Sequence, residues 1–168
     1  MSGRSNKVDT ISINAKEIVL ILKQSGKRIC FAESCTGGMI TASVTDIEGS
    51  SAVFSRGFIT YSNKAKMNML GVKSETLNLY GAVSGQTVAE MASGAITASE
   101  DEADYAVAVS GIAGPEGGTK EKPVGLVYIC VLKKGKVGQV SRYVFDGNRH
   151  TIRTQTVEKA LENIRKLL

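Results

Sequence analysis

The sequence predicts a three-layer α/β/α sandwich in which helices cover both faces of a mixed, mostly parallel five-stranded sheet. Three observations support this prediction: helical and strand-like segments alternate, the strand-like segments are short and apolar, and two of them end in glycine-rich turns. The chain has 168 residues, which fits one domain that buries roughly two-thirds of its unfolded surface. We expect this single domain over residues 9–168, behind a disordered N-terminus at residues 1–8.

The N-terminal half of the chain alternates helices and strands. Ser25-Gly26 ends the first helix, and Gly71 ends a helix that Asn63 can cap. The segment AVFSRGFITY reads as a strand that ends at Tyr61. In order, the pattern predicts a helix over 11–25, a strand over 28–32, a helix over 39–45, a strand over 52–61, a helix over 63–70 and a short helical segment around 77–79.

The C-terminal half begins with a long helix from Ser84. Its Ala, Ser and Gly content predicts close packing on a sheet, and such small residues would also suit a homodimer or homotrimer interface. Residues 104–110, DYAVAVS, form the clearest central strand. Strands over 126–132 and 137–145 follow, joined by the hairpin turn KKGK, and the final helix starts at Arg149.

The net charge of +5 is unevenly distributed along the chain. Residues 71–118 hold one Lys against seven acidic residues, whereas residues 119–168 hold eleven basic residues against four acidic ones. A basic C-terminal third can attract phosphate or nucleic acid. Because no Lys/Arg run with interleaved aromatic residues is present, the sequence does not favour a nucleic-acid platform. A solvated face and one small anionic ligand explain the charge as well.

The three cysteines are Cys30, Cys35 and Cys130. Their odd number, with two of them in apparent strands, predicts reduced thiols in the cytoplasm. With no C-x-x-C motif and a single histidine, His150, we expect no metal site. The first residues lack the apolar stretch of a signal peptide, and no apolar run reaches the length of a membrane span.

Two of the predicted strands run directly into glycine-rich turns that carry hydroxyl groups. These turns are SCTGG at 34–38 and SGIAGP at 110–115. In an open α/β sheet, ligands gather at the carboxyl ends of strands, where glycines let backbone N–H groups approach them. The N-terminus of a following helix adds a partial positive charge. One such loop could be merely a tight turn, but two of them predict a ligand site.

Neither turn has a familiar nucleotide or hydrolase motif. The glycine spacing excludes the dinucleotide fingerprint and the P-loop. Ala32 stands where the G-x-S-x-G nucleophile elbow needs its first glycine. A Ser-His-acid triad would need His150, which is better explained as a surface or capping residue. A base for Ser34 must therefore come from elsewhere in the chain.

Tyr61 and Lys66 follow the second strand, and we expect them at the same edge of the sheet. A lysine whose pKa is lowered by burial and by a cationic neighbour can take a serine proton, and Arg56 or an arginine of the last helix could be that neighbour. From the residues alone, a surface role for Lys66 is the commoner case. Arg149 and Arg153 lie four residues apart and could clamp a phosphate or simply begin a solvated helix.

The chain resembles the CinA C-terminal domain family over residues 10–167. Eight ordered motifs carry the resemblance: AESCTGG (32–38), GSS (49–51), YSNKAK (61–66), LGV (70–72), GAVS (81–84), SGIAGPEGG (110–118), KPVG (122–125) and FDGNR (145–149). Stand-alone members of the family are nicotinamide-mononucleotide (NMN) amidohydrolases of the PncC type. The nucleotide-processing N-terminal domain of longer relatives does not occur in this sequence, so we expect the stand-alone form.

The resemblance implies an α/β/α sandwich that deamidates NMN to nicotinate mononucleotide and ammonia, in pyridine nucleotide recycling, with no metal and no cofactor. Carried onto this sequence, it makes Ser34 the nucleophile, Lys66 the base and Tyr61 the partner of that base. Ser110 stands where we expect Thr in many relatives, and it keeps the hydroxyl. The implied substrate-binding residues are Thr36, Gly37, Gly38, Ser110, Gly111, Ala113, Gly114 and Arg149.

Other hypotheses stay open from the sequence. Cys35 or Thr36 could be the nucleophile, although a buried packing role suits Cys35 better. The domain could instead be a non-catalytic nucleotide- or partner-binding module linked to competence or DNA damage. A nucleic-acid-associated protein is the third class, and steep salt dependence of DNA binding would mark it. Release of ammonia from NMN separates the enzyme from both other classes.

Overall fold

Residues 9–100 and 102–168 are described by the computed structural model, and the disorder expected at residues 1–8 lies outside these residues. The helices are α1 (Thr10–Ser25), α2 (Met39–Thr45), α3 (Asn63–Leu70), α4 (Ser74–Tyr80), α5 (Gly85–Ala98) and α6 (Arg149–Leu167), with a short 3-10 helix, η1, at Ser50–Ala52. The strands are β1 (Ile29–Glu33), β2 (Phe54–Ile59), β3 (Tyr105–Gly111), β4 (Leu126–Lys133) and β5 (Gln139–Val144).

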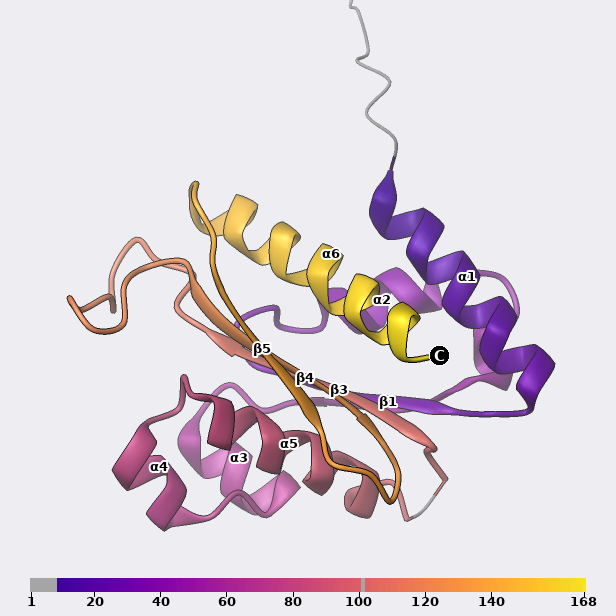
Figure 1. Ribbon diagram of the computed structural model, residues 1–168, viewed down its shortest axis with the longest axis horizontal. Helices are drawn as coiled ribbons and strands as arrows, with labels where there is room; N and C mark the ends of the chain where they lie inside the picture. The colour runs from indigo at the N-terminus through magenta and orange to yellow at the C-terminus, as the bar shows by residue number, and fades with distance from the viewer. Residues whose placement is uncertain (1–8, 101) are drawn as a thin grey trace, which may run out of the picture.

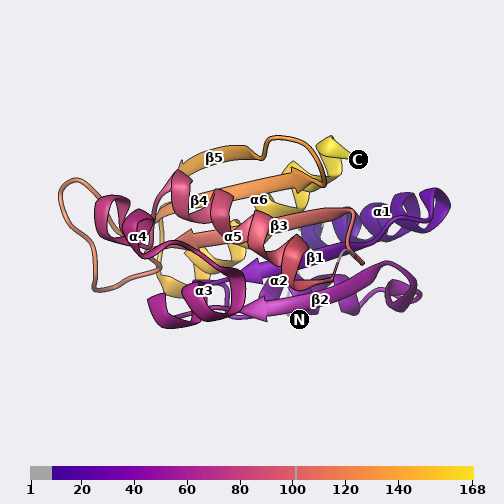
Figure 2. The same ribbon diagram turned by 90° about the horizontal axis from the view of Figure 1, so that it is seen from below.

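The five strands form one sheet in the order β2-β1-β3-β4-β5 (Figure 2). β1 pairs in parallel with β2 and β3, whereas β4 pairs antiparallel with β3 and β5, so every strand except β4 runs in one direction. Helices α1, α2 and α6 cover one face of the sheet, and α3, α4 and α5 cover the other (Figure 1). The predicted three-layer sandwich on a mixed sheet is confirmed.

The central strands divide their side chains between two cores, because successive residues of a strand point to opposite faces. The core on the side of α1 and α6 takes large residues from these strands, among them Ile29, Phe31, Val107 and Val109. The core on the side of α5 takes small ones, Cys30, Ala32, Ala106 and Ala108. Small residues at this face let α5 lie close to the sheet, as its composition predicts.

The small residues of α5 are explained by contacts within one chain. Ala92 and Ala95 are fully buried against the sheet. A Cβ atom on Gly94 would lie 1.8 Å from the backbone oxygen of Leu70, so α5 and the end of α3 touch backbone to backbone. These residues therefore do not argue for a subunit interface, and a homo-oligomer stays a prediction.

Several element boundaries differ from those expected, and three of the differences have a local description. β2 is shorter than 52–61, because residues 50–52 form η1 after Gly49, whose φ is 85°. Ser62, not Asn63, caps α3: its hydroxyl accepts a hydrogen bond from the Ala65 N–H at 3.1 Å. β5 begins at Gln139 instead of residue 137, and Val137 is exposed in the hairpin.

The fold brings the two glycine-rich turns to the same edge of the sheet, as predicted. β1 and β3 are parallel neighbours in which Glu33 pairs with Val109. Beyond the last pair, the Ser34 N–H donates to the Val109 oxygen at 3.2 Å. The turn after β1 and the turn after β3 therefore start side by side, and α6 begins nearby at Arg149.

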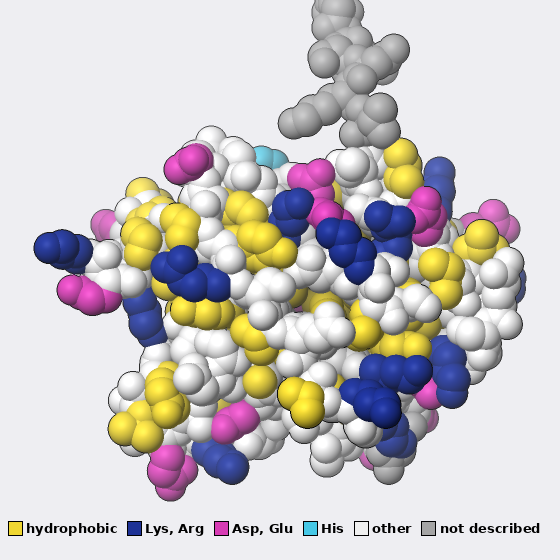
Figure 3. All heavy atoms as spheres, viewed as in Figure 1, with side chains coloured by type: hydrophobic (Ala, Val, Ile, Leu, Met, Phe, Trp, Pro, Cys, Tyr) yellow, Lys and Arg dark blue, Asp and Glu magenta, His cyan; other side chains and the backbone are white. Residues whose placement is uncertain are grey.

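The charged side chains of the surface are mixed in sign. On the face shown in Figure 3, basic groups lie among acidic and hydrophobic ones. Some form exposed ion pairs, such as Lys27 with Asp104 at 2.9 Å and Arg165 with Glu17 at 3.0 Å, and pairs of this kind contribute little stability each. Within the residues described, no helix is both long enough and apolar enough to span a bilayer.

Candidate active site

A pocket of about 160 Å³ opens at the carboxyl ends of β1 and β3. It brings together both glycine-rich turns, the segment after β2 and the start of α6. Four of the predicted substrate-binding residues, Thr36, Gly37, Gly38 and Gly114, do not line it. The lining residues are Ser34, Cys35, Tyr61, Lys66, Ala82, Val83, Ser110, Gly111, Ala113 and Arg149.

The amine of Lys66 lies against the hydroxyl of Ser34 inside this pocket. The distance from Lys66 Nζ to Ser34 Oγ is 3.0 Å. Lys66 is 1% exposed and Ser34 is 7% exposed. The commoner surface role expected for a lysine is therefore wrong for Lys66.

Local structure places Lys66 here. β2 ends at Ile59, and the next residue, Thr60, donates its N–H to the Glu33 oxygen at 2.8 Å, which ties the chain to the end of β1. The Ser62 cap then starts α3, and Lys66 follows on its first turn. The amine turns back to donate to the backbone oxygens of Thr60 at 2.7 Å and Tyr61 at 3.4 Å.

Burial lowers the pKa of Lys66 from 10.5 to about 8, because the ammonium loses its hydration. No carboxylate hydrogen-bonds to this amine in the described part of the chain. The cationic neighbour expected for it is not Arg56, which donates to the Ala98 oxygen at the far end of α5. A neutral amine has two N–H groups and one lone pair. When the amine is charged, it donates to Ser34 Oγ as well as to the two backbone oxygens. When it is neutral, the two backbone oxygens accept its N–H groups, and the lone pair is left for the hydroxyl of Ser34.

Glu33 is a buried carboxylate that sequence reasoning missed. It is 1% exposed, and it accepts hydrogen bonds from the N–H groups of Gly38 at 3.0 Å, Ile40 at 3.1 Å and Thr41 at 2.8 Å. The hydroxyls of Thr36 and Thr41 also donate to it. The sequence did contain a signal of this role, namely a charged residue at the end of a strand that we expected to be buried.

Glu33 changes the expected role of α2. The sequence predicted that the positive N-terminus of this helix would face a ligand. That expectation is wrong, because the Glu33 carboxylate already accepts the N–H groups that such a ligand would need. The turn at 34–38 is thus held by its own strand, and the site needs another group for an anion.

We expect Glu33→Gln to destabilise the protein by about 2–4 kcal/mol, because an amide NH₂ would face N–H donors that now meet a carboxylate. Urea unfolding measures this change. Glu48→Gln, in the exposed loop that follows α2, is the matched control and should leave the free energy of unfolding within about 0.5 kcal/mol. Equal stability of both variants would contradict the structural role of Glu33.

The turn after β3 holds the opposite wall of the pocket. Ser110 Oγ donates to the Ala82 oxygen at 2.7 Å. Lys122, which lies in the KPVG motif, donates to the oxygens of Tyr80 at 2.5 Å and Val83 at 2.8 Å. Sequence reasoning missed this role of Lys122. The two side chains fix the segment between α4 and α5, which lines the pocket.

Gly111 and Gly114 are required by close contacts in the same turn. A Cβ atom on Gly111 would lie 2.6 Å from Val127 Cγ2 and 2.9 Å from the Leu126 oxygen. Gly114 has a φ of 75°, and its Cβ would meet Val124 at 2.5 Å. These glycines shape the turn, and only Gly111 reaches the pocket wall.

Arg149 and Tyr61 meet at the mouth of the pocket. Arg149 donates to the Tyr61 hydroxyl at 3.0 Å and to the Gly114 oxygen at 2.9 Å. Tyr61 is 60% exposed. We expected Tyr61 to contact Lys66, and the backbone oxygen of Tyr61 makes that contact. The phenol hydroxyl of Tyr61 instead accepts a hydrogen bond from Arg149. Arg153 does not join Arg149 in a clamp, because it donates to the backbone of the turn at 34–38.

Neither rival nucleophile is placed to react in the pocket as Ser34 is. Burial raises the pKa of the Cys35 thiol to about 11, so the thiolate is scarce at neutral pH. The Thr36 hydroxyl donates to Glu33 at 2.6 Å and does not line the pocket. Of the three hydroxyl and thiol groups in this turn, only that of Ser34 contacts an amine.

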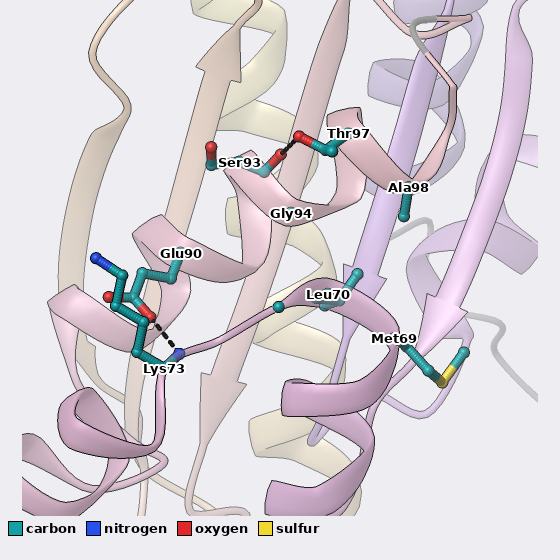
Figure 4. Close-up of a pocket in the computed structure, with 9 residues that line it drawn as sticks. Met69, Leu70, Lys73, Glu90, Ser93, Gly94, Thr97 and Ala98 are labelled. Carbon is teal, nitrogen blue, oxygen red and sulfur yellow. Dashed lines mark hydrogen bonds between the residues drawn. The ribbon is translucent and has the colours of Figure 1, made fainter.

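A larger hollow, of about 500 Å³, lies between α3 and α5 (Figure 4). Glu90 there accepts the Lys73 N–H at 2.8 Å, and Gly94 lies beside Leu70. None of its lining residues comes from either glycine-rich turn. Among the described residues, no group of three or more His, Cys, Asp or Glu side chains could hold a metal ion. The smaller pocket is therefore the one with reactive groups.

An α/β/α sandwich with a serine hydroxyl hydrogen-bonded to a buried amine has the arrangement of a hydrolase that uses a lysine base. The comparison with known families gives the particular class. The model of the CinA C-terminal domain matches residues 12–168, and the chain belongs to this family.

Its relatives include short and long proteins. A protein named nicotinamide-nucleotide amidohydrolase PncC from Escherichia coli K12 is 48% identical over 150 residues, which cover 89% of this chain and 90% of that protein. A CinA-like protein from Endomicrobium trichonymphae is 50% identical over 160 residues, but this chain spans only 36% of its length. The crystal structure of the competence/damage inducible protein CihA from Agrobacterium tumefaciens has a TM-score of 0.91 at 45% identity, covering 97% of this chain and 98% of that one.

Proposed function

We propose that this protein is an amidohydrolase that converts NMN to nicotinate mononucleotide and ammonia, with Ser34 as its nucleophile. The observation that carries the proposal is the 3.0 Å hydrogen bond between Ser34 and the buried amine of Lys66. The names of relatives that cover most of the chain support the substrate, since PncC of E. coli K12 is a nicotinamide-nucleotide amidohydrolase.

The first half of the reaction acylates Ser34. The neutral amine of Lys66 takes the hydroxyl proton, and Ser34 Oγ forms a bond to the carboxamide carbon. The carbonyl oxygen becomes an oxyanion that backbone N–H groups of the turn at 34–38 can stabilise. When the tetrahedral intermediate collapses, the C–N bond breaks and Lys66 returns its proton to the departing nitrogen, which leaves as ammonia.

The second half hydrolyses the acyl-enzyme. Lys66 is neutral again after ammonia has left, so it can take a proton from a water molecule that attacks the ester carbon. The bond to Ser34 Oγ then breaks, and Lys66 gives this proton to the hydroxyl. The product acid releases its proton to the solvent and leaves as the nicotinate carboxylate, and Ser34 and Lys66 return to their starting states.

The size of the pocket suits the nicotinamide ring of NMN better than the whole nucleotide. Its volume of about 160 Å³ is below the roughly 300–1,000 Å³ of pockets that enclose a drug-sized ligand. The pyridine carboxamide fits beside Ser34, and the ribose and phosphate extend toward the mouth. Arg149 lies there with guanidinium N–H groups beyond the two it uses on Gly114 and Tyr61. We assign the phosphate to Arg149.

Arg149→Gln should raise KM for NMN about 10- to 100-fold with a smaller change in kcat, because a charge-assisted hydrogen bond to phosphate is lost. Steady-state kinetics measure this effect. His150→Gln, at the next and exposed position, is the control and should leave KM unchanged. Nicotinamide riboside lacks the phosphate, so an equal loss with that substrate would contradict the assignment.

A direct assay tests the proposed function. The purified protein should release ammonia from NMN, and EDTA should not change the rate. Binding of NMN without turnover would favour the non-catalytic module, and salt-dependent DNA binding without turnover would favour a nucleic-acid partner. The three cysteines are free and buried, which supports a reducing compartment such as the cytoplasm, where the reaction would recycle pyridine nucleotides.

A further inference from the structure

The proposed reaction needs N–H donors for its oxyanion, and most amides near Ser34 are already occupied. The Ser34 N–H donates to the Val109 oxygen at 3.2 Å. The Gly37 N–H donates to the Ser34 oxygen at 3.1 Å, and the Gly38 N–H donates to Glu33. These three groups cannot serve the substrate without breaking an existing bond.

The amides of Cys35 and Thr36 remain. Neither donates a hydrogen bond to another residue in the described part of the chain. Thr36 is fully buried and does not line the pocket, whereas Cys35 forms part of the pocket wall. In serine hydrolases of the α/β class, the residue after the nucleophile supplies one N–H donor to the oxyanion. The amide of Cys35, the residue after Ser34, is therefore the candidate donor of an oxyanion hole.

Arg153 holds the two carbonyls that follow the Cys35 amide. It comes from the second turn of α6, more than a hundred residues away in sequence. Its Nε donates to the Cys35 oxygen at 3.0 Å, and its Nη2 donates to the Thr36 oxygen at 2.9 Å. The Gly37 N–H holds the Ser34 oxygen, which belongs to the same planar peptide unit as the Cys35 N–H. Arg153 and Gly37 therefore fix the peptide planes on the two sides of Cys35.

We propose that Arg153 is a positioning residue that sets the oxyanion hole, by fixing the Cys35 and Thr36 carbonyls so that the Cys35 N–H faces the reacting carbonyl beside Ser34. The inference rests on the proposed function for its reaction. Glu33 works from the other end of the turn, where it holds the amides of Gly38 and Thr41. Arg153 thus holds the turn by its carbonyl groups, and Glu33 holds it by amide groups at the point where it joins α2.

The contact requires the planar fork of an arginine. Two adjacent N–H groups of one guanidinium reach two successive carbonyls, whereas a lysine carries a single ammonium on a flexible stem. Arg153→Lys keeps the charge on α6 and can keep one of the two bonds. It should therefore preserve the fold but release the orientation of the Cys35 amide.

The experiment compares Arg153→Lys with Arg165→Lys, a half-buried position on the same helix, in the full-length protein. Loss of one oxyanion donor lowers kcat by about 10²–10³-fold, and a misdirected donor should cost about 10- to 100-fold in kcat for NMN with KM within about threefold. The rate at which a fluorophosphonate labels Ser34 should fall in parallel, because the phosphoryl oxygen uses the same donors. Arg165→Lys should match the wild type in both assays.

Each outcome decides one question. Unchanged kcat and labelling in Arg153→Lys would overturn the inference and leave the proposed function standing. A rise in KM alone, absent with nicotinamide riboside, would overturn it by placing Arg153 on the phosphate. If the wild type released no ammonia from NMN while Ser34 labelling still depended on Arg153, the proposed substrate would fail and the positioning role would stand. Partial recovery of the labelling rate of Arg153→Ala by added guanidinium would support that role.

Discussion

Ser34→Ala should lower the release of ammonia from NMN on the order of 10⁴-fold or more, because no other group in the pocket has both a nucleophilic oxygen and a base. The change removes one oxygen atom from a side chain that is 7% exposed, so the fold should stay intact. A coupled ammonia assay measures the rate, and circular dichroism and thermal unfolding check the fold.

Two further variants complete this test. Cys35→Ala removes the rival nucleophile and should keep most of the activity, because the pKa of about 11 leaves little thiolate to lose. Ser43→Ala, whose hydroxyl bonds to the Met39 oxygen within α2, controls for the loss of a serine elsewhere. Full activity in Ser34→Ala together with inactivity in Cys35→Ala would assign the reaction to the thiol.

Lys66→Met should abolish turnover to a similar extent, since it replaces the amine with an apolar chain of similar length. The wild type should show kcat/KM rising with pH through about 8, because the base must be neutral in the free enzyme. Lys64→Met, on the exposed side of α3, is the matched control and should keep both the rate and the pH profile. A profile that is flat between pH 6 and pH 9 would be incompatible with Lys66 as the base.

The same residue predicts a pH dependence of stability. The pKa of Lys66 is about 8 in the folded state and near 10.5 in the unfolded chain, so between these values the unfolded state binds more protons. Stability of the wild type relative to Lys66→Met should therefore rise from pH 8 to about 10.5, by at most about 3 kcal/mol, and stay level below pH 8. Urea unfolding of both proteins across this range measures the difference.

The sequence was sufficient to predict the helices and strands and the edge of the sheet at which the candidate site lies. Alternating segments and two glycine-rich strand ends predicted that the turns at 34–38 and 110–115 would meet, and parallel pairing of β1 with β3 brings them together. Boundaries that depend on single hydrogen bonds were less predictable. Ser62 and Asn63 are both good capping residues, and the extended backbone conformation of Ser62 in the structure identifies it as the cap.

Roles that depend on long-range partners could not be predicted from the chain alone. Glu33 and Arg153 both hold the turn at 34–38, but the partners of Arg153 are 117 and 118 residues away. Lys122 reaches backbone oxygens 39 and 42 residues away. Local patterns carry no information about which carbonyl such a side chain will meet. The burial of Lys66 could not be predicted for the same reason, since it depends on the packing of α3 against α5 and on the contact with Ser34, 32 residues away in sequence.

No carboxylate among the described residues pairs with Lys66, so we expect the protonation of this proposed base to respond to the binding of substrate. Its proton affinity is governed by how much water reaches the amine, since burial is the cause of the lowered pKa. An aromatic ring that enters the pocket displaces water and weakens the ammonium further. In the proposed mechanism we therefore expect Lys66 to be partly protonated in the free protein and to lose its proton more readily once the ring has bound.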